Sequence, residues 1–163
     1  MSSESSGAEV VVRLATESDA ELLARFRFEL RSFFHEVLEG EAAFIERCAE
    51  WMRERLRSGG AWSCWIAEHQ QKPVGAVWVQ LIEKIPNPIA EPEYYVYLTN
   101  FYVREQFRGI GIGSMLLSEA LAWSKANNAE TVILWPTERS KALYSRHGFT
   151  LASNFMQLTI GEP

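Results

Sequence analysis

The sequence has no apolar run that approaches the roughly 20 residues a helix needs to cross a bilayer. Its first eight residues contain no apolar stretch of the kind found in secretory signals. Basic side chains are in deficit, with 16 Lys and Arg against 21 Asp and Glu, so the formal net charge is −5. Binding to nucleic-acid phosphates needs a basic surface. We therefore expect no membrane span, no secretory leader and no nucleic-acid partner, and these absences favour a cytoplasmic protein.

Cysteine is also scarce. The chain has two, Cys48 and Cys64, and their spacing matches no zinc-binding or CxxC motif. Both lie within apolar patterns, which favours buried free thiols in a reducing compartment over a disulfide. We expect no metal site.

The length and composition are those of one globular domain. The chain has 163 residues, of which 47% are hydrophobic and 23% charged. Residues 1–8 are small and polar and are predicted to form a disordered tail. Residues 9–163 are predicted to form a single domain.

Hydrophobic periodicity predicts a mixed α/β domain with elements in the order β-α-α-β-β-β-α-β-α-β. A β-branched run at 10–14 is followed by two segments of helical period, the first starting at Thr16 and containing Phe33 and Phe34. The second ends at Gly59. Later strands are expected at residues 61–68, 74–84, 95–103, 131–135 and 149–158, with helices after the glycine-rich turn and before Gly148.

That glycine-rich turn joins the strongest strand pattern, at 95–103, to the next helix. It reads QFRGIGIGS from Gln106 to Ser114. A helix N-terminus has unsatisfied N–H groups, and glycines leave them accessible, so the turn can bind a phosphate or pyrophosphate beside Arg108. The dinucleotide pattern GxGxxG fails at Ser114 or Leu116, and no Gly-Lys-Ser/Thr follows, which disfavours a nucleotide-binding oxidoreductase. The alternative is a tight turn that binds nothing.

A second motif, LYSRHGF at 143–149, ends the next helix. Together with Arg108-x-x-Gly111-x-Gly113, it resembles the GNAT superfamily of acetyl-CoA-dependent N-acetyltransferases. Members of that family carry Gln/Arg-x-x-Gly-x-Gly/Ala after the fourth strand and Leu-Tyr-x-x-x-Gly-Phe further along. The predicted element order also matches from about residue 10 to residue 158. The resemblance implies an α/β (α+β) fold, a single GNAT-like domain with a mixed central sheet flanked by helices.

The same resemblance implies acetyl-CoA as cosubstrate, with its pyrophosphate on the backbone amides of the turn. The pantetheine arm would pair with the main chain of 101–103, where the next strand splays away. The family often has Asn near the start of the last helix, whereas this chain has TERS at 137–140, so Ser140 or Arg139 is expected there. The implied cofactor-binding residues are Phe101, Tyr102, Val103, Arg108, Gly109, Ile110, Gly111, Ile112, Gly113, Ser114, Ser140 and Tyr144.

For catalysis, the resemblance makes Tyr144 the general acid that protonates the departing thiolate. The alternative is a core tyrosine with a polar tip. The position that holds a glutamate base in some relatives is Tyr97 here, which is a poor base. Glu93 is the nearest carboxylate upstream and is the candidate base, the alternative being a solvated loop residue.

The acceptor is expected to be a primary amine of a small molecule, amino acid or peptide. The resemblance places the acceptor wall at the first two helices and their connection, with Phe34, His35, Tyr97 and Asn100 as substrate-binding candidates. Acidic residues in 36–41 and 91–93 would suit an amine, unless they form a solvated helix junction. Relatives often pair through their C-terminal strands, which makes a homodimer one expected assembly. The lack of a base at Tyr97 keeps a non-catalytic acyl-CoA-binding sensor or regulatory module as the alternative function.

Overall fold

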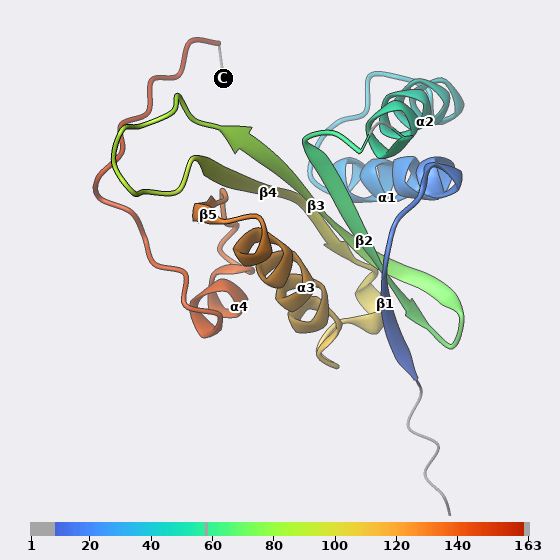
Figure 1. Ribbon diagram of the computed structural model, residues 1–163. Coiled ribbons are helices and arrows are strands. Elements are labelled where there is room, and N and C mark those ends of the chain that lie inside the picture. Colours follow the sequence, from blue (N-terminus) through green and yellow to red (C-terminus); the bar gives the residue numbers. More distant parts are fainter. Residues whose placement is uncertain (1–8, 58, 162–163) are drawn as a thin grey trace, which may run out of the picture.

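The computed structural model describes residues 9–57 and 59–161, so the predicted tail at 1–8 lies outside the described residues. Its centre is a five-stranded sheet in the order β1-β2-β3-β4-β5 (Figure 1). The strands are β1 (Val10–Leu14), β2 (Trp62–His69), β3 (Lys72–Glu83), β4 (Tyr94–Val103) and β5 (Ala129–Ile133). All neighbours are antiparallel except β4 and β5, which are parallel. The expected α/β fold with a mixed sheet is confirmed.

Side-chain alternation along β2 and β3 explains why both faces of the sheet are covered. Cys64 and Ile66 enter one apolar cluster, whereas Trp65 and Ala67 enter the other. Successive side chains of a strand point to opposite faces, so a run that is apolar at every position needs a layer on each side. The middle of β3 is buried at six consecutive residues, 74–79, as this requirement predicts.

Helices supply those layers (Figure 1). One face is covered by α1 (Ala20–Ser32) and α2 (Glu41–Arg57), and the other by α3 (Ile112–Ala126). The short α4 (Lys141–Arg146) follows β5, and one-turn 3-10 helices occupy Glu17–Asp19 and Glu105–Phe107. No helix within residues 9–57 and 59–161 is long and apolar enough to cross a bilayer.

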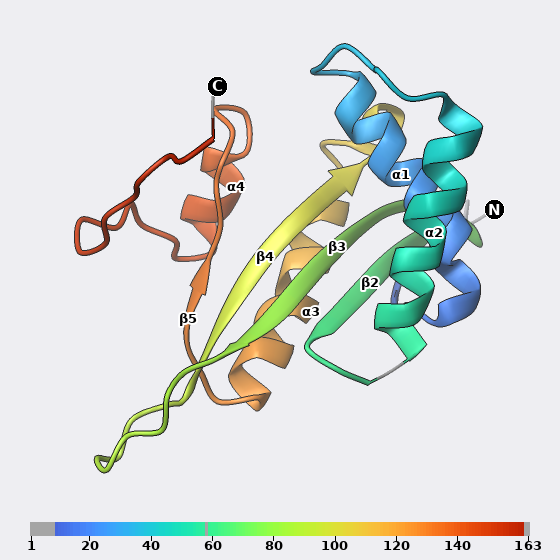
Figure 2. The same ribbon diagram turned by 90° about the horizontal axis from the view of Figure 1, so that it is seen from above.

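The parallel pair β4 and β5 separates along its length. Pairing runs from Tyr94 with Ala129 to Tyr97 with Ile133 and then stops, although β4 continues to Val103. Figure 2 shows the two strands close together at one end and diverging toward their carboxyl ends. The second half of β4 therefore presents an edge that β5 does not cover, as the resemblance implied.

Two local predictions are wrong. Residues 149–158 form no strand, and the side chains after Phe149 are exposed, with Leu151 at 84% and Met156 at 99%. An alternating pattern specifies a strand only where a partner edge is available, and this segment pairs with no strand among the described residues. The first helix ends at Ser32, so Phe33 and Phe34 lie beyond it and are exposed. Both cysteines are free as expected, although Cys48 is only half-buried.

Candidate active site

A cavity of about 820 Å³ lies where β4 and β5 diverge, and we call it the β4–β5 cavity. Its lining comes from α1, the second half of β4, the glycine-rich turn, the segment after β5, and α4. Elements far apart in sequence thus meet at one place, at the carboxyl ends of parallel strands, where open α/β sheets commonly bind ligands.

The glycine-rich turn forms one end of this cavity. Gly109 and Gly111 have φ of 79° and 91°, which glycine adopts without the strain of other residues. Gly111 caps the N-terminus of α3. The backbone amides of 109–114 have no hydrogen-bond acceptor in the described part of the chain. These amides, at the positive end of a helix, can bind an anion.

Arginines surround the same end. Arg108 Nε donates to the carbonyl oxygen of Val103 at 2.7 Å, which fixes the guanidinium beside the strand end. Burial, and then the neighbouring charge of Arg139, lower the pKa of Arg108. Arg139 and Arg146 also line the cavity. The pKa shift shows that Arg108 and Arg139 lie within electrostatic reach of each other, so a bound anion would relieve their repulsion.

The uncovered half of β4 forms the wall that leads away from the turn. Between the pairs Thr99–Trp78 and Tyr102–Ala76, β4 contains one more residue than β3, which makes a β-bulge at Asn100 and Phe101. Asn100 has φ of 50° there. A bulge turns backbone groups away from the regular ladder, so its amide and carbonyl groups can pair with a ligand.

Tyr144 reaches this wall from α4. It is buried, and its ring lies 6.1 Å from that of Phe101 and 5.5 Å from that of Phe149. Burial raises the pKa of Tyr144 to about 12. The hydroxyl group has no hydrogen-bond partner within the described ranges, yet the residue lines the cavity. Tyr144 therefore presents a protonated, unengaged donor.

Ser140 lines the cavity from the start of α4, but its hydroxyl group is engaged. Ser140 Oγ accepts from the backbone N–H of Thr137 at 2.9 Å and lies 3.1 Å from the carbonyl oxygen of Thr137. These contacts hold residues 137–140 in a tight turn against the cavity. Ser140 thus positions the turn, and a contact with a ligand would have to compete with Thr137.

The opposite end of the cavity is aromatic and basic. Tyr97 packs edge-on against Trp135 with ring centroids 5.3 Å apart. This end is lined by Arg27 and Arg31 of α1 and by Phe34, the second residue after that helix. The predicted residues Phe34, Tyr97 and Asn100 all line the cavity, whereas Arg27 and Arg31 were not predicted. The spacing of the two arginines shows that they share one face of the helix, but the sequence does not show that this face meets the cavity.

Other candidates lie elsewhere. His35 and Glu93 do not line the cavity. Glu93 precedes Asn100 by seven residues, which is roughly 23 Å along a strand at about 3.3 Å per residue. Its carbonyl oxygen accepts from the Lys84 amide where the loop leaves β3. The structure therefore places the candidate base at the end of β4 that lies away from the bulge, because the loop joins the strand there. Ile110 and Ile112 do not line the cavity either, since Ile110 is exposed and the Ile112 side chain is in the core.

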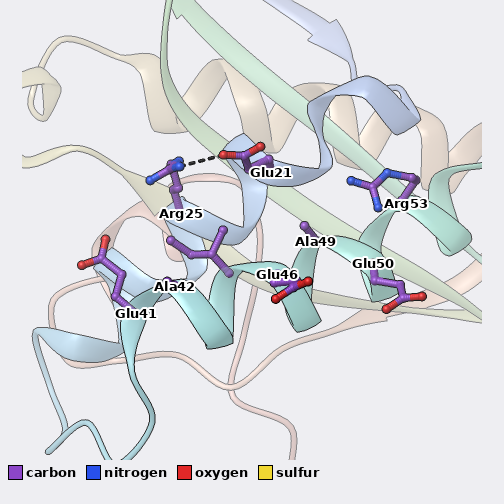
Figure 3. Close-up of a pocket in the computed structure, with 9 residues that line it drawn as sticks. Glu21, Arg25, Glu41, Ala42, Glu46, Ala49, Glu50 and Arg53 are labelled. Atoms are coloured by element: carbon purple, nitrogen blue, oxygen red, sulfur yellow. Dashed lines mark hydrogen bonds and ion pairs between the residues drawn. The ribbon is translucent and has the colours of Figure 1, made fainter.

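A second hollow, of about 620 Å³, lies between α1 and α2 (Figure 3). It is rich in carboxylates, including Glu41, Glu46 and Glu50, and the Glu21–Arg25 ion pair closes one side at 2.7 Å. The tyrosine and the glycine-rich turn belong to the other cavity, so this hollow has no part in the candidate site. In the part of the chain that the structure describes, no cluster of three or more His, Cys, Asp or Glu could hold a metal ion.

Comparison with known proteins agrees with this geometry. The model of the acetyltransferase (GNAT) family matches residues 24–149. The chain therefore belongs to the acetyltransferase (GNAT) family. It is 26% identical over 146 residues to an uncharacterised N-acetyltransferase of Methanocaldococcus jannaschii, a match that covers 85% of this chain. The match covers only 59% of that relative's own length.

Solved structures share the fold. A GCN5-related N-acetyltransferase of Ralstonia eutropha JMP134 is 26% identical, with a TM-score of 0.76 over 94% of this chain and 100% of that one. A predicted acetyltransferase of Clostridium acetobutylicum, solved with acetyl-CoA, is 20% identical, with a TM-score of 0.77 over 93% and 97%.

Proposed function

We propose that this protein is an acetyl-CoA-dependent N-acetyltransferase that transfers acetyl to a primary amine by direct attack on the thioester. One observation carries the proposal: a single cavity is lined by the glycine-rich turn with its free amides, by the uncovered half of β4 and by Tyr144. The family relationship and the solved relative that holds acetyl-CoA support the same donor.

In this proposal, the amides of the turn and Arg108 bind the pyrophosphate, and the pantetheine arm lies along β4. The arm adds main-chain hydrogen bonds where β5 has diverged. The thioester would then reach the bulge at Asn100 and Phe101, whose backbone groups can stabilise the oxyanion as it develops. The phosphates and the reacting group are thus held by different parts of one strand-turn-helix unit.

The chemical step follows from the residues around the bulge. The amine nitrogen forms a bond to the thioester carbon, the carbon–sulfur bond breaks, and the thiolate takes a proton from Tyr144. A donor with a pKa of about 12 is protonated at neutral pH. The positively charged nitrogen of the tetrahedral intermediate loses its extra proton to solvent, so the products are a neutral amide and the CoA thiol, and water then reprotonates Tyr144.

No carboxylate or imidazole lies at the acceptor end of the cavity among the described residues, since Glu138 is the acidic residue in the lining and it pairs with Lys141 at the surface. Deprotonation of the acceptor therefore falls to water, which Thr99 and Asn100 can orient from the cavity wall. The enzyme would act on the neutral fraction of the amine.

The test has two parts. Calorimetry with CoA measures binding at the turn, and thiol release from acetyl-CoA across a panel of primary amines measures transfer. Binding with amine-dependent thiol release supports the proposal. Binding of CoA without thiol release from any amine would favour the acyl-CoA-binding module. That alternative is motivated by Tyr97, which stands where some relatives have a glutamate base. No binding of CoA would refute both.

We also propose that the protein forms a homodimer through the residues after α4. The support is the exposed apolar side chains of this segment, which include Leu158 and Ile160, and the position of β5 as an edge strand of the sheet. Light scattering on the full chain should give twice the chain mass, and a chain ending at Thr150 should give the monomer mass. Equal masses for the two proteins would contradict this assembly.

A further inference from the structure

Arg27 and Arg31 stand one helical turn apart on α1 and both line the β4–β5 cavity. Residues at i and i+4 share one face of a helix, and Phe34 continues the same stripe just past the helix end. Arg27 is half-buried, and burial and then the charge of Arg31 lower its pKa. Two like charges therefore face one cavity.

Neither arginine has an acidic partner within residues 9–57 and 59–161. Other arginines of the chain do: Arg25 pairs with Glu21 at 2.7 Å, and Arg104 pairs with Glu29 at 2.9 Å. The hydrogen bond of Arg27 is to a neutral group, from Nη1 to Asn100 Oδ1 at 3.2 Å. A partly buried charge without a counter-charge is costly, and a second positive charge beside it adds to the cost. The site is thus arranged for an anion that arrives from solution.

The position of Arg27 and Arg31 in the cavity indicates which ligand would carry the anion. Asn100, the partner of Arg27, forms the bulge with Phe101, and the Phe101 ring contacts Tyr144. The coenzyme's phosphates would lie at the other end, where Arg108 and Arg139 flank the amides of the turn. An anion at Arg27 and Arg31 is therefore next to the reacting amine and apart from the coenzyme phosphates.

We propose that the amine acceptor carries an oxyanion, a carboxylate or a phosphate, which Arg27 and Arg31 bind while Phe34 and Tyr97 contact its apolar part. This inference rests on the proposed acetyltransferase activity. It reverses the expectation of an acidic acceptor wall, because the carboxylates of 36–41 and 91–93 do not line the cavity. A guanidinium matches either oxyanion through paired N–H donors, so both belong to the same class of acceptor.

The first experiment compares matched amines by thiol release at saturating acetyl-CoA. The pairs are O-phosphoethanolamine with ethanolamine, glucosamine 6-phosphate with glucosamine, and L-phenylalanine with L-phenylalanine amide. The first two pairs report a phosphate and the third a carboxylate. We expect kcat/KM to be at least about tenfold higher for the anionic member of one pair, the size expected for a charge-assisted hydrogen bond. Equal rates, or faster reaction of the neutral members, overturn the inference while leaving acetyl transfer itself intact.

Variants then assign the preference to these side chains. R27Q and R31Q should each raise KM for the anionic amine about tenfold and remove the preference, while KM for acetyl-CoA stays within about twofold. R25Q is the matched control, because Arg25 lies on the same helix but pairs with Glu21 and faces the other hollow. It should keep the preference. A rise in KM for acetyl-CoA in R27Q or R31Q would instead assign the arginines to the coenzyme and overturn the inference.

A binding measurement decides the matter even if no amine in the panel reacts. With the protein saturated with CoA, so that the turn is occupied, inorganic phosphate and benzoate are titrated by calorimetry. Wild type and R25Q should bind one of them in the millimolar range, and the R27Q/R31Q double variant should bind it about tenfold more weakly. Equal affinity in all three proteins overturns the inference, whereas absent thiol release with anion binding intact counts against the proposed activity alone.

Discussion

At the scale of single residues, burial prepares Tyr144 for its proposed role. The hydroxyl group lies in the cavity, while the ring is packed between Phe101 and Phe149. The aromatic packing fixes the direction in which the hydroxyl oxygen points, and burial holds the pKa at about 12. The same environment that makes Tyr144 a core residue therefore makes it a donor. A place in the core and a role as proton donor are therefore compatible for Tyr144.

The substitution Tyr144→Phe tests this role. It keeps the ring and removes the proton, so kcat should fall by about 10²–10⁴, the usual contribution of general acid catalysis. CoA affinity by calorimetry should stay within about twofold, since the turn binds the phosphates. Tyr95→Phe is the control, because Tyr95 lies at the other end of β4, where its ring faces Lys84. Unchanged kcat in Tyr144→Phe would return Tyr144 to a packing role.

The pH profile gives a second test. A raised pKa keeps Tyr144 protonated to higher pH, so its ionisation should cause no loss of rate below about pH 11. The rate with an alkylamine should instead rise from pH 7 to 10, because the neutral amine increases toward its own pKa of about 10.4. A falling limb between pH 9 and 10 that disappears in Tyr144→Phe would contradict the assignment.

Two substitutions of nearly equal size at Gly111 test the anion site. Gly111→Asn and Gly111→Asp both occupy a position with φ of 91°, and no atom lies within 4 Å of the added Cβ. Asn and Asp tolerate a left-handed backbone similarly, so their strain cancels in the comparison. Asp should weaken CoA binding at least about tenfold more than Asn, through repulsion of the pyrophosphate. Equal dissociation constants would show that no anion binds there.

Some of the residues that line the cavity can be predicted from the sequence and others cannot, for a physical reason. The turn and Tyr144 were readable because their chemistry depends on local spacing, such as glycines before a helix. Whether Arg27, Arg31 or Glu93 lies in the cavity depends on which helix face or strand end meets it. That is set by tertiary packing, which local pattern does not encode.

At the scale of elements, β4 connects the core to the site. Its first half pairs on both sides and is part of the sheet, while its second half pairs only with β3. Gly75 on β3 permits the close approach of the two strands there, since a Cβ at Gly75 would lie 2.6 Å from the carbonyl oxygen of Tyr102. The position of the cavity wall therefore depends on a glycine outside both motifs.

Gly75→Ala should destabilise the protein by about 1–3 kcal/mol, the usual cost of overpacking, because backbone must move to admit the methyl group. Urea unfolding measures the change. Gly40→Ala, in the loop before α2, is the control, since a Cβ there meets nothing within 4 Å. Equal stability of Gly75→Ala and wild type would show that β4 shifts freely against β3.

Most elements were predictable from sequence because they bury a periodic apolar face, as α2 does, or a continuous apolar run, as β2 does. The exception is residues 149–158, which contain several large apolar side chains but form no strand. Local pattern reports what a segment can form, whereas a strand also needs a neighbour to accept its hydrogen bonds. That neighbour lies outside the local sequence, and the proposed dimer would supply it from a second copy.

At the scale of the whole molecule, the charge around the cavity is opposite in sign to the net charge of the chain. The chain is acidic, with a formal net charge of −5, yet five arginines line the β4–β5 cavity against one carboxylate, Glu138. The carboxylates concentrate elsewhere, for example around the hollow between α1 and α2 in Figure 3. An acidic protein can therefore attract a polyanionic coenzyme, because the local field of a cleft outweighs distant charges screened by salt.

This arrangement predicts a salt dependence that separates the phosphates from the rest of the coenzyme. Acetyl-CoA affinity should fall at least about fivefold between 20 mM and 500 mM NaCl, because the Debye length shrinks well below the width of the cavity. S-acetylpantetheine lacks the phosphates and should bind with the same, weaker affinity at both salt concentrations. Calorimetry on the full chain measures both. If salt weakened the two ligands equally, the arginine-rich lining would not be acting on the phosphates, and the affinity for acetyl-CoA would have to come from the pantetheine contacts along β4.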